Sequence, residues 1–410
     1  MRRRSFSIAL SLALAGCAVR GPLFVLDASE DALDGALVDA DAPAEDGRDA
    51  PASEGGACST PVVDSTRAFD LSLGESHGCA IDRGALRCWG ANDEGALGAG
   101  DTVDRTSPTA LTVGRWVAVA AGDDSTCAID DARAVWCWGA NGSGQLGLGD
   151  TLARSRPERV AALCDARLIS GAFDHYCVID GASRLYCWGR NSEGQLGQAD
   201  EYPGRNALAP LEVMPSGRWR AVATGDGHTC ALQSDQSLWC WGRNPDGQLG
   251  LGAGTSIQIR SPQRVGTLSD WERLDVAQDQ SCAIRAGGEL YCWGAGDALP
   301  LGLQRAPVRI GAFGDWSTVA VSTFAACGTR RAGGLYCWGR NAEGQLGLGT
   351  IEPRTEPALA TLGATLTGLS LGRFHGCARD ATAVYCTGEN NRGQLGVGDR
   401  NRRSVFTAQP

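Results

Sequence analysis

Apolar and polar residues alternate along residues 115–120 (RWVAVA), which is the period-two pattern of a half-buried β-strand. Two further short strands follow at 126–129 (TCAI) and 134–138 (AVWCW), and the polar residues between them predict a hairpin turn. A fourth strand is expected after a glycine-rich loop, at 108–113 in this unit and at 157–161 in the next. Four short antiparallel strands form one blade of a β-propeller, so the pattern predicts an all-β fold.

The same unit recurs along the chain. Each copy holds two cysteines nine or ten residues apart, followed in most copies by a glycine-rich tail such as GQLGLG. The second cysteines are separated by 45 to 53 residues, a period typical of propellers and solenoids. Seven copies are counted from the pairs Cys79 and Cys88, Cys127 and Cys137, Cys177 and Cys187, Cys230 and Cys240, Cys282 and Cys292, Cys327 and Cys337, and Cys377 and Cys386.

We expect each pair to be a disulfide between neighbouring strands of one blade. With the turn centred on Ala132, Cys127 faces Cys137, and directly opposed positions of antiparallel strands lie at disulfide distance. No CxxC motif occurs and each repeat has one histidine at most, so a zinc site is not expected. Cys58 and Cys164 are left over; their pairing with each other is an option that the sequence leaves open.

Composition and charge exclude several classes of function. The chain has 410 residues and no lysine, so its 37 basic residues are all arginine. A Schiff-base lysine and a phosphate-loop lysine are therefore excluded. The formal net charge is −10, and residues 57–410 are mildly acidic. Nucleic acid is not expected as a partner, because binding to phosphates requires a basic surface.

The N-terminal residues predict export and a lipid anchor. MRRRSFSIALSLALAGC has a basic start and an apolar run too short to span a bilayer, as in a secretory signal at 1–16. Leu14-Ala15-Gly16-Cys17 resembles the cleavage box of bacterial lipoproteins, in which the cysteine is acylated; the alternative is an ordinary signal with an accidental cysteine. The expected location is the outer membrane or cell surface, with attachment by the lipid alone.

An acidic segment separates this anchor from the repeats. Residues 27–56 hold ten acids and one arginine among Ala, Pro and Gly, so 17–57 are expected to be a disordered tether. The propeller is assigned to 58–410.

The recurring run H-x-C-A-[IL]…[LV]-[YW]-C-W-G-x-N-x-x-G-Q-L-G-x-G-D resembles the repeat of the regulator of chromosome condensation family over about residues 67–410. In that family seven repeats close a seven-bladed propeller, which matches the count here. Cysteines take the place of the residues usual at two hairpin positions, as fits an exported variant.

Three repeats depart from the family pattern, and we expect local irregularity in their blades. The fifth, CWGAGDALPLGLQRAP, lacks the Asn and the Gly-Gln, the first has Ala96 in place of Gln, and the seventh has Thr387 in place of Trp. The first unit also lacks a preceding Pro-led strand. Residues 404–408 match that strand, so we predict that they pair into the first blade and close the ring.

Candidates for catalysis are better explained by the repeat. Gly74-Glu75-Ser76-His77-Gly78 matches the G-x-S-x-G nucleophile motif, but it leads into a strand and not into a helix. The histidines at 77, 175, 228 and 375 all lie two residues before a repeat cysteine, which indicates hydrogen-bonding struts. We therefore assign no catalytic, cofactor-binding or metal-binding residue and expect no cofactor.

The arginines that follow the glycine-rich tails are the candidate partner-binding residues. We expect them to occupy equivalent loops and to form a ring near one face, or else to pair with acids such as Asp101, Asp104 or Asp150. The longest loop, 198–210, adds Tyr202. The candidates are Arg105, Arg154, Tyr202, Arg205, Arg260, Arg305, Arg354 and Arg400. The tryptophans of the CWG motifs are expected to pack between blades.

These observations favour a monomeric, non-catalytic scaffold that binds a protein or a surface polymer. The family resemblance includes a nuclear exchange factor for a small GTPase and a secreted bacterial inhibitor that grips β-lactamase with its propeller face. The inhibitor is the closer analogy for an exported chain, although fold alone identifies no partner. The alternatives are an enzyme of lyase or glycosidase type with its site in the propeller mouth, and a purely structural envelope component.

Overall fold

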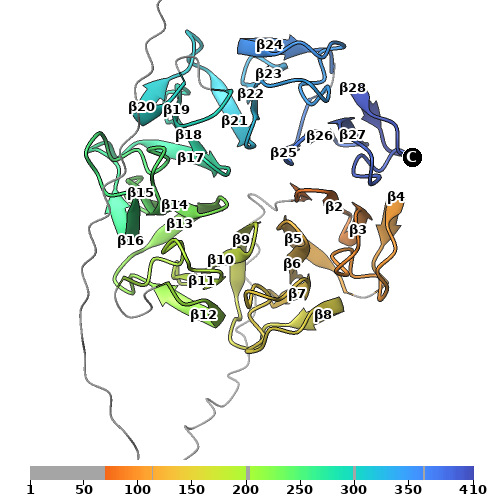
Figure 1. Ribbon diagram of the computed structural model, residues 1–410, viewed down its shortest axis with the longest axis horizontal. Coiled ribbons are helices and arrows are strands. Elements are labelled where there is room, and N and C mark those ends of the chain that lie inside the picture. The colour runs from red at the N-terminus through yellow and green to blue at the C-terminus, as the bar shows by residue number, and fades with distance from the viewer. Residues whose placement is uncertain (1–69, 113, 200–203, 299–301, 363–364) are drawn as a thin grey trace, which may run out of the picture. The chain divides into compact units, whose positions relative to one another are not determined.

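The computed structural model describes residues 70–112, 114–199, 204–298, 302–362 and 365–410. In these residues the chain forms seven four-stranded antiparallel sheets arranged in a ring (Figure 1). The seven-bladed propeller and the four strands per blade are thus confirmed. None of the described residues belongs to a helix that is long and apolar enough to cross a membrane.

Each blade consists of four strands that are consecutive in sequence. Blades 1 to 4 are formed by β1 (Leu71–Leu73), β2 (His77–Asp82), β3 (Ala85–Gly90) and β4 (Arg105–Ala110); β5 (Trp116–Ala121), β6 (Ser125–Asp130), β7 (Val135–Gly139) and β8 (Arg154–Arg159); β9 (Ala166–Ala172), β10 (His175–Asp180), β11 (Leu185–Gly189) and β12 (Ala207–Val213); and β13 (Trp219–Thr224), β14 (His228–Gln233), β15 (Leu238–Arg243) and β16 (Gln258–Arg264).

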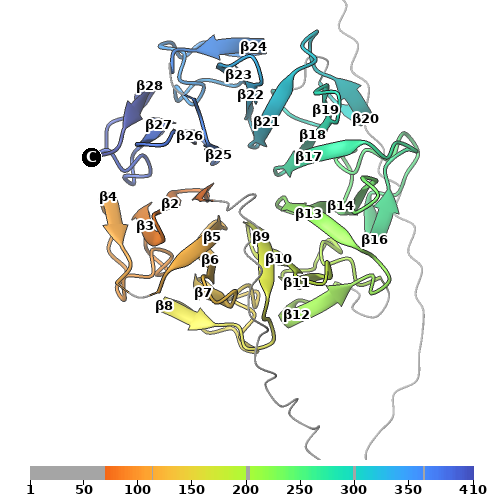
Figure 2. The same ribbon diagram turned by 180° about the vertical axis from the view of Figure 1, so that it is seen from behind.

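The remaining blades continue in the same order. Blades 5 to 7 are formed by β17 (Trp271–Val276), β18 (Gln280–Arg285), β19 (Leu290–Gly294) and β20 (Gln304–Arg309); β21 (Trp316–Val321), β22 (Ala325–Arg330), β23 (Leu335–Gly339) and β24 (Arg354–Ala360); and β25 (Gly368–Leu371), β26 (His375–Arg379), β27 (Val384–Gly388) and β28 (Arg403–Ala408). The first strand of each blade lies nearest the centre and the fourth lies at the perimeter, as Figure 2 shows from behind.

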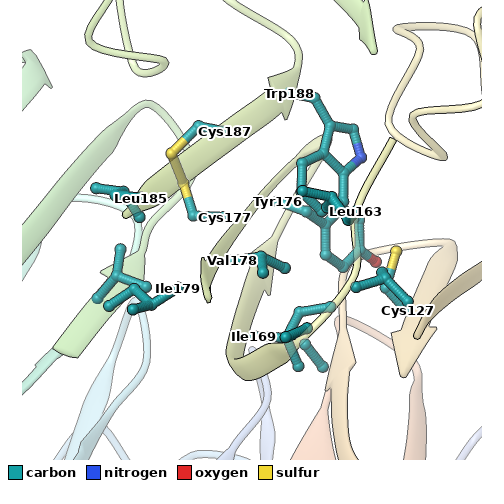
Figure 3. Close-up of a cluster of buried hydrophobic side chains, with 14 of the residues drawn as sticks. Cys127, Leu163, Ile169, Tyr176, Cys177, Val178, Ile179, Leu185, Cys187 and Trp188 are labelled. Atoms are coloured by element: carbon teal, nitrogen blue, oxygen red, sulfur yellow. A yellow bond between two sulfur atoms is a disulfide. The ribbon is translucent and has the colours of Figure 1, made fainter. Parts of the chain in front are cut away.

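The second and third strands of every blade are joined by a disulfide. In blade 3, Cys177 is the direct partner of Cys187 in the strand register, and their Cα atoms are 4.2 Å apart. The other six pairs have Cα atoms 4.1 Å apart, and all fourteen cysteines are buried. Figure 3 shows the Cys177–Cys187 bridge beside the buried cluster around Trp188. The predicted one disulfide per blade is confirmed.

The other two residues of the CWG motif have separate structural roles. The pairing of the third and fourth strands shifts register between the cysteine and the glycine, for example between Cys137 and Gly139. Gly139 has a φ of 99°, a conformation that residues with a Cβ atom rarely adopt. The tryptophan between them is therefore directed into the contact between two blades.

Each of these tryptophans donates a hydrogen bond to the preceding blade. In blade 2, Trp138 Nε1 lies 2.8 Å from the carbonyl oxygen of Ala96, and Trp89 in blade 1 reaches Gln394 of blade 7 at 2.9 Å. Packing between blades was expected from the regular spacing, and the buried indoles agree with it.

The expected irregularity is not seen in the strands of the three unusual repeats, since blades 1, 5 and 7 all contain four paired strands. In blade 5 the carbonyl of Ala298 still accepts from Trp338 at 2.8 Å. In blade 7 the hydroxyl of Thr387 donates to the carbonyl of Gly344 at 2.8 Å, and Phe406 lies against Gly347 where an indole lies against Gly197. Small substitutions in the motif are thus compensated locally.

The predicted closure of the ring by 404–408 is wrong. These residues belong to β28, which pairs with β27 in the last blade and not with the first blade. Every Pro-led strand completes the hairpin that precedes it, because the chain needs only one loop to fold back beside the third strand. Blades 1 and 7 meet through side chains and through a backbone hydrogen bond from Gly398 N to the carbonyl oxygen of Thr106 at 2.8 Å.

Candidate functional site

Two sets of loops lie on the same face of the propeller. The first and third strands of a blade are both antiparallel to the second, so they end at the same edge of the sheet. Loops 74–76 and 91–104 of blade 1 follow these ends and therefore share one face, which we call the loop face. A direct contact between two such loops supports this placement. Gln145 Nε2, between the third and fourth strands of blade 2, lies 2.7 Å from Asp174 Oδ1, between the first and second strands of blade 3.

A channel runs between the first strands of all seven blades and has a volume of about 460 Å³. Its wall carries an inter-blade hydrogen bond at several contacts, in which a side-chain oxygen accepts the backbone N–H of the next blade. Ser72, Ser170 and Ser370 accept at 3.0, 3.1 and 3.1 Å, and Asp275 accepts from Val321 at 2.7 Å.

The mouth of this channel on the loop face breaks the repeat. One side chain from each blade lines it, and these are Glu75, Asp123, Phe173, Asp226, Gln278, Thr323 and Arg373. The second and third strands of the blades repeat closely in sequence, whereas these seven positions differ in charge and size.

In blades 1 to 4, carboxylates line the mouth or stand next to a residue that lines it. We call Glu75, Asp123, Asp124, Asp174 and Asp226 the acidic sector. Burial, and then the charges of Glu75, Asp124, Asp226 and Asp174, raise the pKa of Asp123 to about 8. Burial also raises the pKa of each of the other three aspartates above its usual value. Arg373 pairs with Glu75, and Arg190 lies 3.7 Å from Asp226. Burial still disfavours the ionised forms of the four aspartates, so a cation bound there would stabilise them.

One substitution leaves part of this charge exposed. In blades 2 and 4, glutamines contact the aspartate of the next blade, as Gln145 does with Asp174. The first repeat has Ala96 in place of that glutamine, so the exposed Asp124 receives no such bond.

Beside the mouth, the loops of blades 6 and 7 carry aromatic side chains. Phe324 and Phe374 are stacked with ring centroids 5.1 Å apart. The guanidinium of Arg340 lies 5.0 Å from the Phe324 ring centroid, and that of Arg373 lies 5.3 Å from the Phe374 centroid. We call these four residues the aromatic sector. Arg373 also forms an ion pair with Glu75, so the aromatic sector meets the acidic sector where blades 7 and 1 adjoin.

The predicted arginine ring is not formed, because the candidates do not occupy equivalent positions. The residue that pairs with the CWG glycine is Arg105, Arg154 or Arg354 in three blades. In the other four blades the glycine pairs with Ala207, Ile259, Gln304 and Arg403. The candidate arginines of these blades are one to three residues away from the position that pairs with the glycine; they are Arg205, Arg260, Arg305 and Arg400. Loops of different length carry the arginines to different places.

Pairing with nearby acids, the alternative explanation, holds for three candidates. Arg105 lies 2.6 Å from Asp101, Arg154 lies 2.7 Å from Asp150, and Arg400 lies 3.2 Å from Asp104. Arg205 and Arg354 are exposed, while Arg260 and Arg305 are half-buried. Tyr202, Cys17 and Cys58 lie outside the described residues, so their predicted roles stay predictions; Cys164 is exposed.

Three of the four histidines are struts between blades, whereas both ring nitrogens of the buried His375 lack a hydrogen-bond partner in the described part of the chain. The Nε2 atoms of His77 and His175 lie 2.9 Å from the hydroxyls of Thr126 and Thr229, and His228 contacts Ser281 in the same way. Burial lowers the pKa of His77 to about 4, so it is neutral at physiological pH. Residues 74–76 form a turn between β1 and β2, and His77 and Gly78 already belong to β2, which excludes the strand–turn–helix context of a nucleophile motif.

The acidic sector is the group of residues that sequence reasoning missed. The signal was present in the sequence, because an acid stands one or two residues after an equivalent glycine or alanine in each of repeats 1 to 4. Among the described residues, no three His, Cys, Asp or Glu side chains gather closely enough to hold a metal ion.

Comparison with known proteins places these features in a wider group. A family model described as the RCC1-like domain matches residues 44–325, and the regulator of chromosome condensation (RCC1) repeat matches residues 332–379. The ultraviolet-B receptor UVR8 of Arabidopsis thaliana is 30% identical over 239 residues, which are 57% of this chain and 42% of the receptor. The probable E3 ubiquitin-protein ligase HERC3 of Homo sapiens is 39% identical over 84 residues, 20% of this chain and 8% of the ligase. The chain thus spans less than half the length of either relative.

Two solved structures share the fold. Human WBSCR16 superimposes with a TM-score of 0.70 at 21% identity, covering 80% of this chain and 94% of that one. Prp20p from Saccharomyces cerevisiae gives a TM-score of 0.70 at 18% identity, covering 83% of this chain and 87% of Prp20p.

Proposed function

Because the chain belongs to the RCC1-like domain family, we propose that it is a non-catalytic binding scaffold whose partner docks on the loop face. The observation that carries the proposal is the channel mouth, where unrepeated charged and aromatic side chains interrupt an otherwise regular ring. Prp20p, which has the same fold, binds Gsp1p and histones, and Kap60 has been crystallised bound to yeast RCC1. A rigid disulfide-linked ring loses little conformational entropy on binding, which favours recognition by its loops.

The proposal includes export and attachment to a membrane through Cys17. Its supports are the basic start, the short apolar run and the cleavage box before that cysteine. Seven buried disulfides are also consistent with an oxidising compartment. The signal at 1–16, the tether at 17–57 and the propeller at 58–410 are the corresponding segments.

Acylation and location are tested together with Cys17→Ser. The full chain and the variant are expressed in a bacterium fed labelled palmitate, and membranes are separated from soluble material. We expect label and membrane association in the parent chain only. A parent chain that is unlabelled and soluble would refute the anchor.

Binding is tested by capture from envelope extracts. The oxidised full chain is immobilised beside a variant with Leu152→Ser and Ile257→Ser, two exposed changes on the loop face. A protein or polymer retained by the parent and lost from the variant supports the scaffold. Retention of the same material by both would place binding elsewhere, and retention of nothing would favour a structural envelope component.

A second candidate function is supported by the raised pKa of Asp123. A carboxyl that stays protonated near neutral pH suits general acid catalysis, and Glu75 supplies a neighbouring carboxylate. The alternative is therefore a lyase or glycosidase with its site in the mouth. Turnover of envelope polysaccharides that is lost in Asp123→Asn would favour the enzyme, whereas binding without turnover favours the scaffold.

A further inference from the structure

Aliphatic side chains project into solvent from the loop face. Val103, Leu152 and Ile257 are 61, 65 and 72% exposed, and each stands two residues before the partner of a CWG glycine. Leu303 and Ile351 are 48 and 49% exposed in the corresponding loops of blades 5 and 6. We call these five residues the apolar collar. Single exposed aliphatic residues are common, but recurrence on one face indicates an interaction surface.

The fold does not need these side chains. A buried asparagine holds the loop through main-chain carbonyls, with Asn92 Nδ2 3.2 Å from Val103 O and Asn141 Nδ2 3.0 Å from Leu152 O. In blade 7 the same bond joins Asn390 to the carbonyl of Asn401 at 3.0 Å, with a polar residue at the collar position. In blades 1, 2, 4 and 6 the aliphatic groups are therefore presented on loops that an asparagine holds.

The acidic sector and the apolar collar lie on the same face, with the acids at the channel mouth and the collar farther out. The collar is carried by the loops before the perimeter strands, whereas the acids are carried by the loops after the central strands. A complementary partner therefore has positive charge at its centre and apolar groups around it.

Resting on the binding function proposed above, we infer that the loop face docks a protein with a basic projection. Arginine or lysine side chains of the partner enter the acidic sector, and apolar residues beside them contact the collar. The charges at the mouth determine the choice of partner and its rate of association, and the collar supplies the buried apolar area.

Other classes of occupant fit less well. A metal ion lacks a set of three suitable ligands in the described part of the chain. A small organic cation would satisfy the mouth but leave the collar exposed, since collar residues come from five blades. A polyanion would meet the exposed carboxyl of Asp124 beside the entrance, and the arginines next to Glu75 and Asp226 are already paired with those acids.

The first experiment measures binding of hexa-arginine and hexa-glutamate peptides to the oxidised full chain by calorimetry at low salt. The acid variant is Asp124→Asn with Asp226→Asn. The matched control, Asp131→Asn with Glu289→Gln, removes two charges from hairpin turns on the opposite face. All changes are isosteric, and thermal unfolding verifies that each variant is folded.

We expect hexa-arginine alone to bind, about tenfold more weakly to the acid variant and unchanged to the control. Leu152→Ser with Ile257→Ser should leave peptide binding unchanged, because the peptide has no apolar groups for the collar. Failure of hexa-arginine to bind, or equal loss in the control, would overturn the inference.

Capture from envelope extracts separates the two proposals. The inference predicts that a captured protein is lost from both the collar variant and the acid variant, and that raised salt releases it. Loss from the collar variant alone would keep the scaffold and refute the basic projection. Capture of nothing, or equal capture by all variants, would refute the scaffold and the inference with it.

Discussion

Asp104 in blade 1 accepts two hydrogen bonds from Arg392 in blade 7, with Nε–Oδ2 and Nη2–Oδ1 distances of 2.9 Å each. Asp104 also lies 3.2 Å from Arg400, and its side chain is only 14% exposed. These contacts lie at the seam where the first and last blades meet. Besides Arg400, three arginines of blade 7 and its loops form ion pairs with acids of blade 1 at this seam. Arg373 pairs with Glu75, and Arg379 pairs with Asp70 and Asp82. Arg392 pairs with Asp93 as well as with Asp104.

Neutralising this acid should weaken the closed ring. Asp104→Asn removes the charge that Arg392 and Arg400 share, and hydrogen bonds to charged groups contribute about 1.5–3 kcal/mol each. We expect the free energy of unfolding in urea to fall by about 2 kcal/mol. The matched control is Glu158→Gln, which removes the partner of Arg154 within one outer strand and should cost less than about 0.5 kcal/mol. Equal losses in the two variants would show that the seam is not special.

Asp275 should make the propeller less stable as the pH rises. Its partial burial in the channel wall raises its pKa from 3.8 to about 7, although the N–H of Val321 opposes the shift. The folded state then holds a proton that the unfolded state has released, so stability is lost between about pH 4 and pH 7. The full shift corresponds to roughly 4 kcal/mol, which water in the channel reduces.

The test is Asp275→Ser, because serine makes the equivalent bond at Ser72, Ser170 and Ser370. We expect the variant to be more stable than the parent at pH 8 and similar at pH 4, measured by urea unfolding at each pH. As a control, Ser370→Ala should lose stability equally at both pH values, since it removes an acceptor without a titrating group. A variant with the parent's full pH dependence would refute the assignment to Asp275.

Thr387 and Phe406 should behave as one unit. Phe406 lies against Gly347, the place that an indole fills beside Gly197, so blade 7 divides the function of one tryptophan between two residues. Phe406→Ala should destabilise by about 2 kcal/mol through a cavity, and Thr387→Trp by about 1–3 kcal/mol through overpacking. In the double variant the indole should fill the cavity, giving a favourable coupling of about 2 kcal/mol. Additive losses in a double-mutant cycle would contradict this account.

How far the sequence predicts this protein depends on the range of the contact. The pairing of Cys127 with Cys137 can be predicted, because a hairpin is local and its register follows from its turn. The strand that pairs with residues 404–408 cannot be predicted in this way, since a repeat gives no sign of which strand begins a blade. The acidic sector was missed for a related reason. Glu75, Asp123 and Asp226 are far apart in sequence, and only the closed ring brings their charges together.

Each disulfide should contribute independently to stability. A bridge that spans about ten residues lowers the conformational entropy of the unfolded chain, which stabilises the folded state by about 3 kcal/mol in the chain-entropy model. Replacing Cys127 and Cys137 together by alanine should therefore lower the free energy of unfolding by about that amount while the propeller stays folded, because the strands on both sides remain paired.

The same change in blade 5, at Cys282 and Cys292, provides the matched comparison, since its loop has the same length and its cysteines are equally buried. We expect equal losses in urea unfolding and an additive loss when both bridges are removed, because the two blades are not neighbours. The parent should also resist reduction by dithiothreitol until it unfolds, since the fourteen bridged cysteines are inaccessible. Rapid reduction of the folded protein, or a bridge whose removal costs nothing, would contradict a stabilising role for that blade.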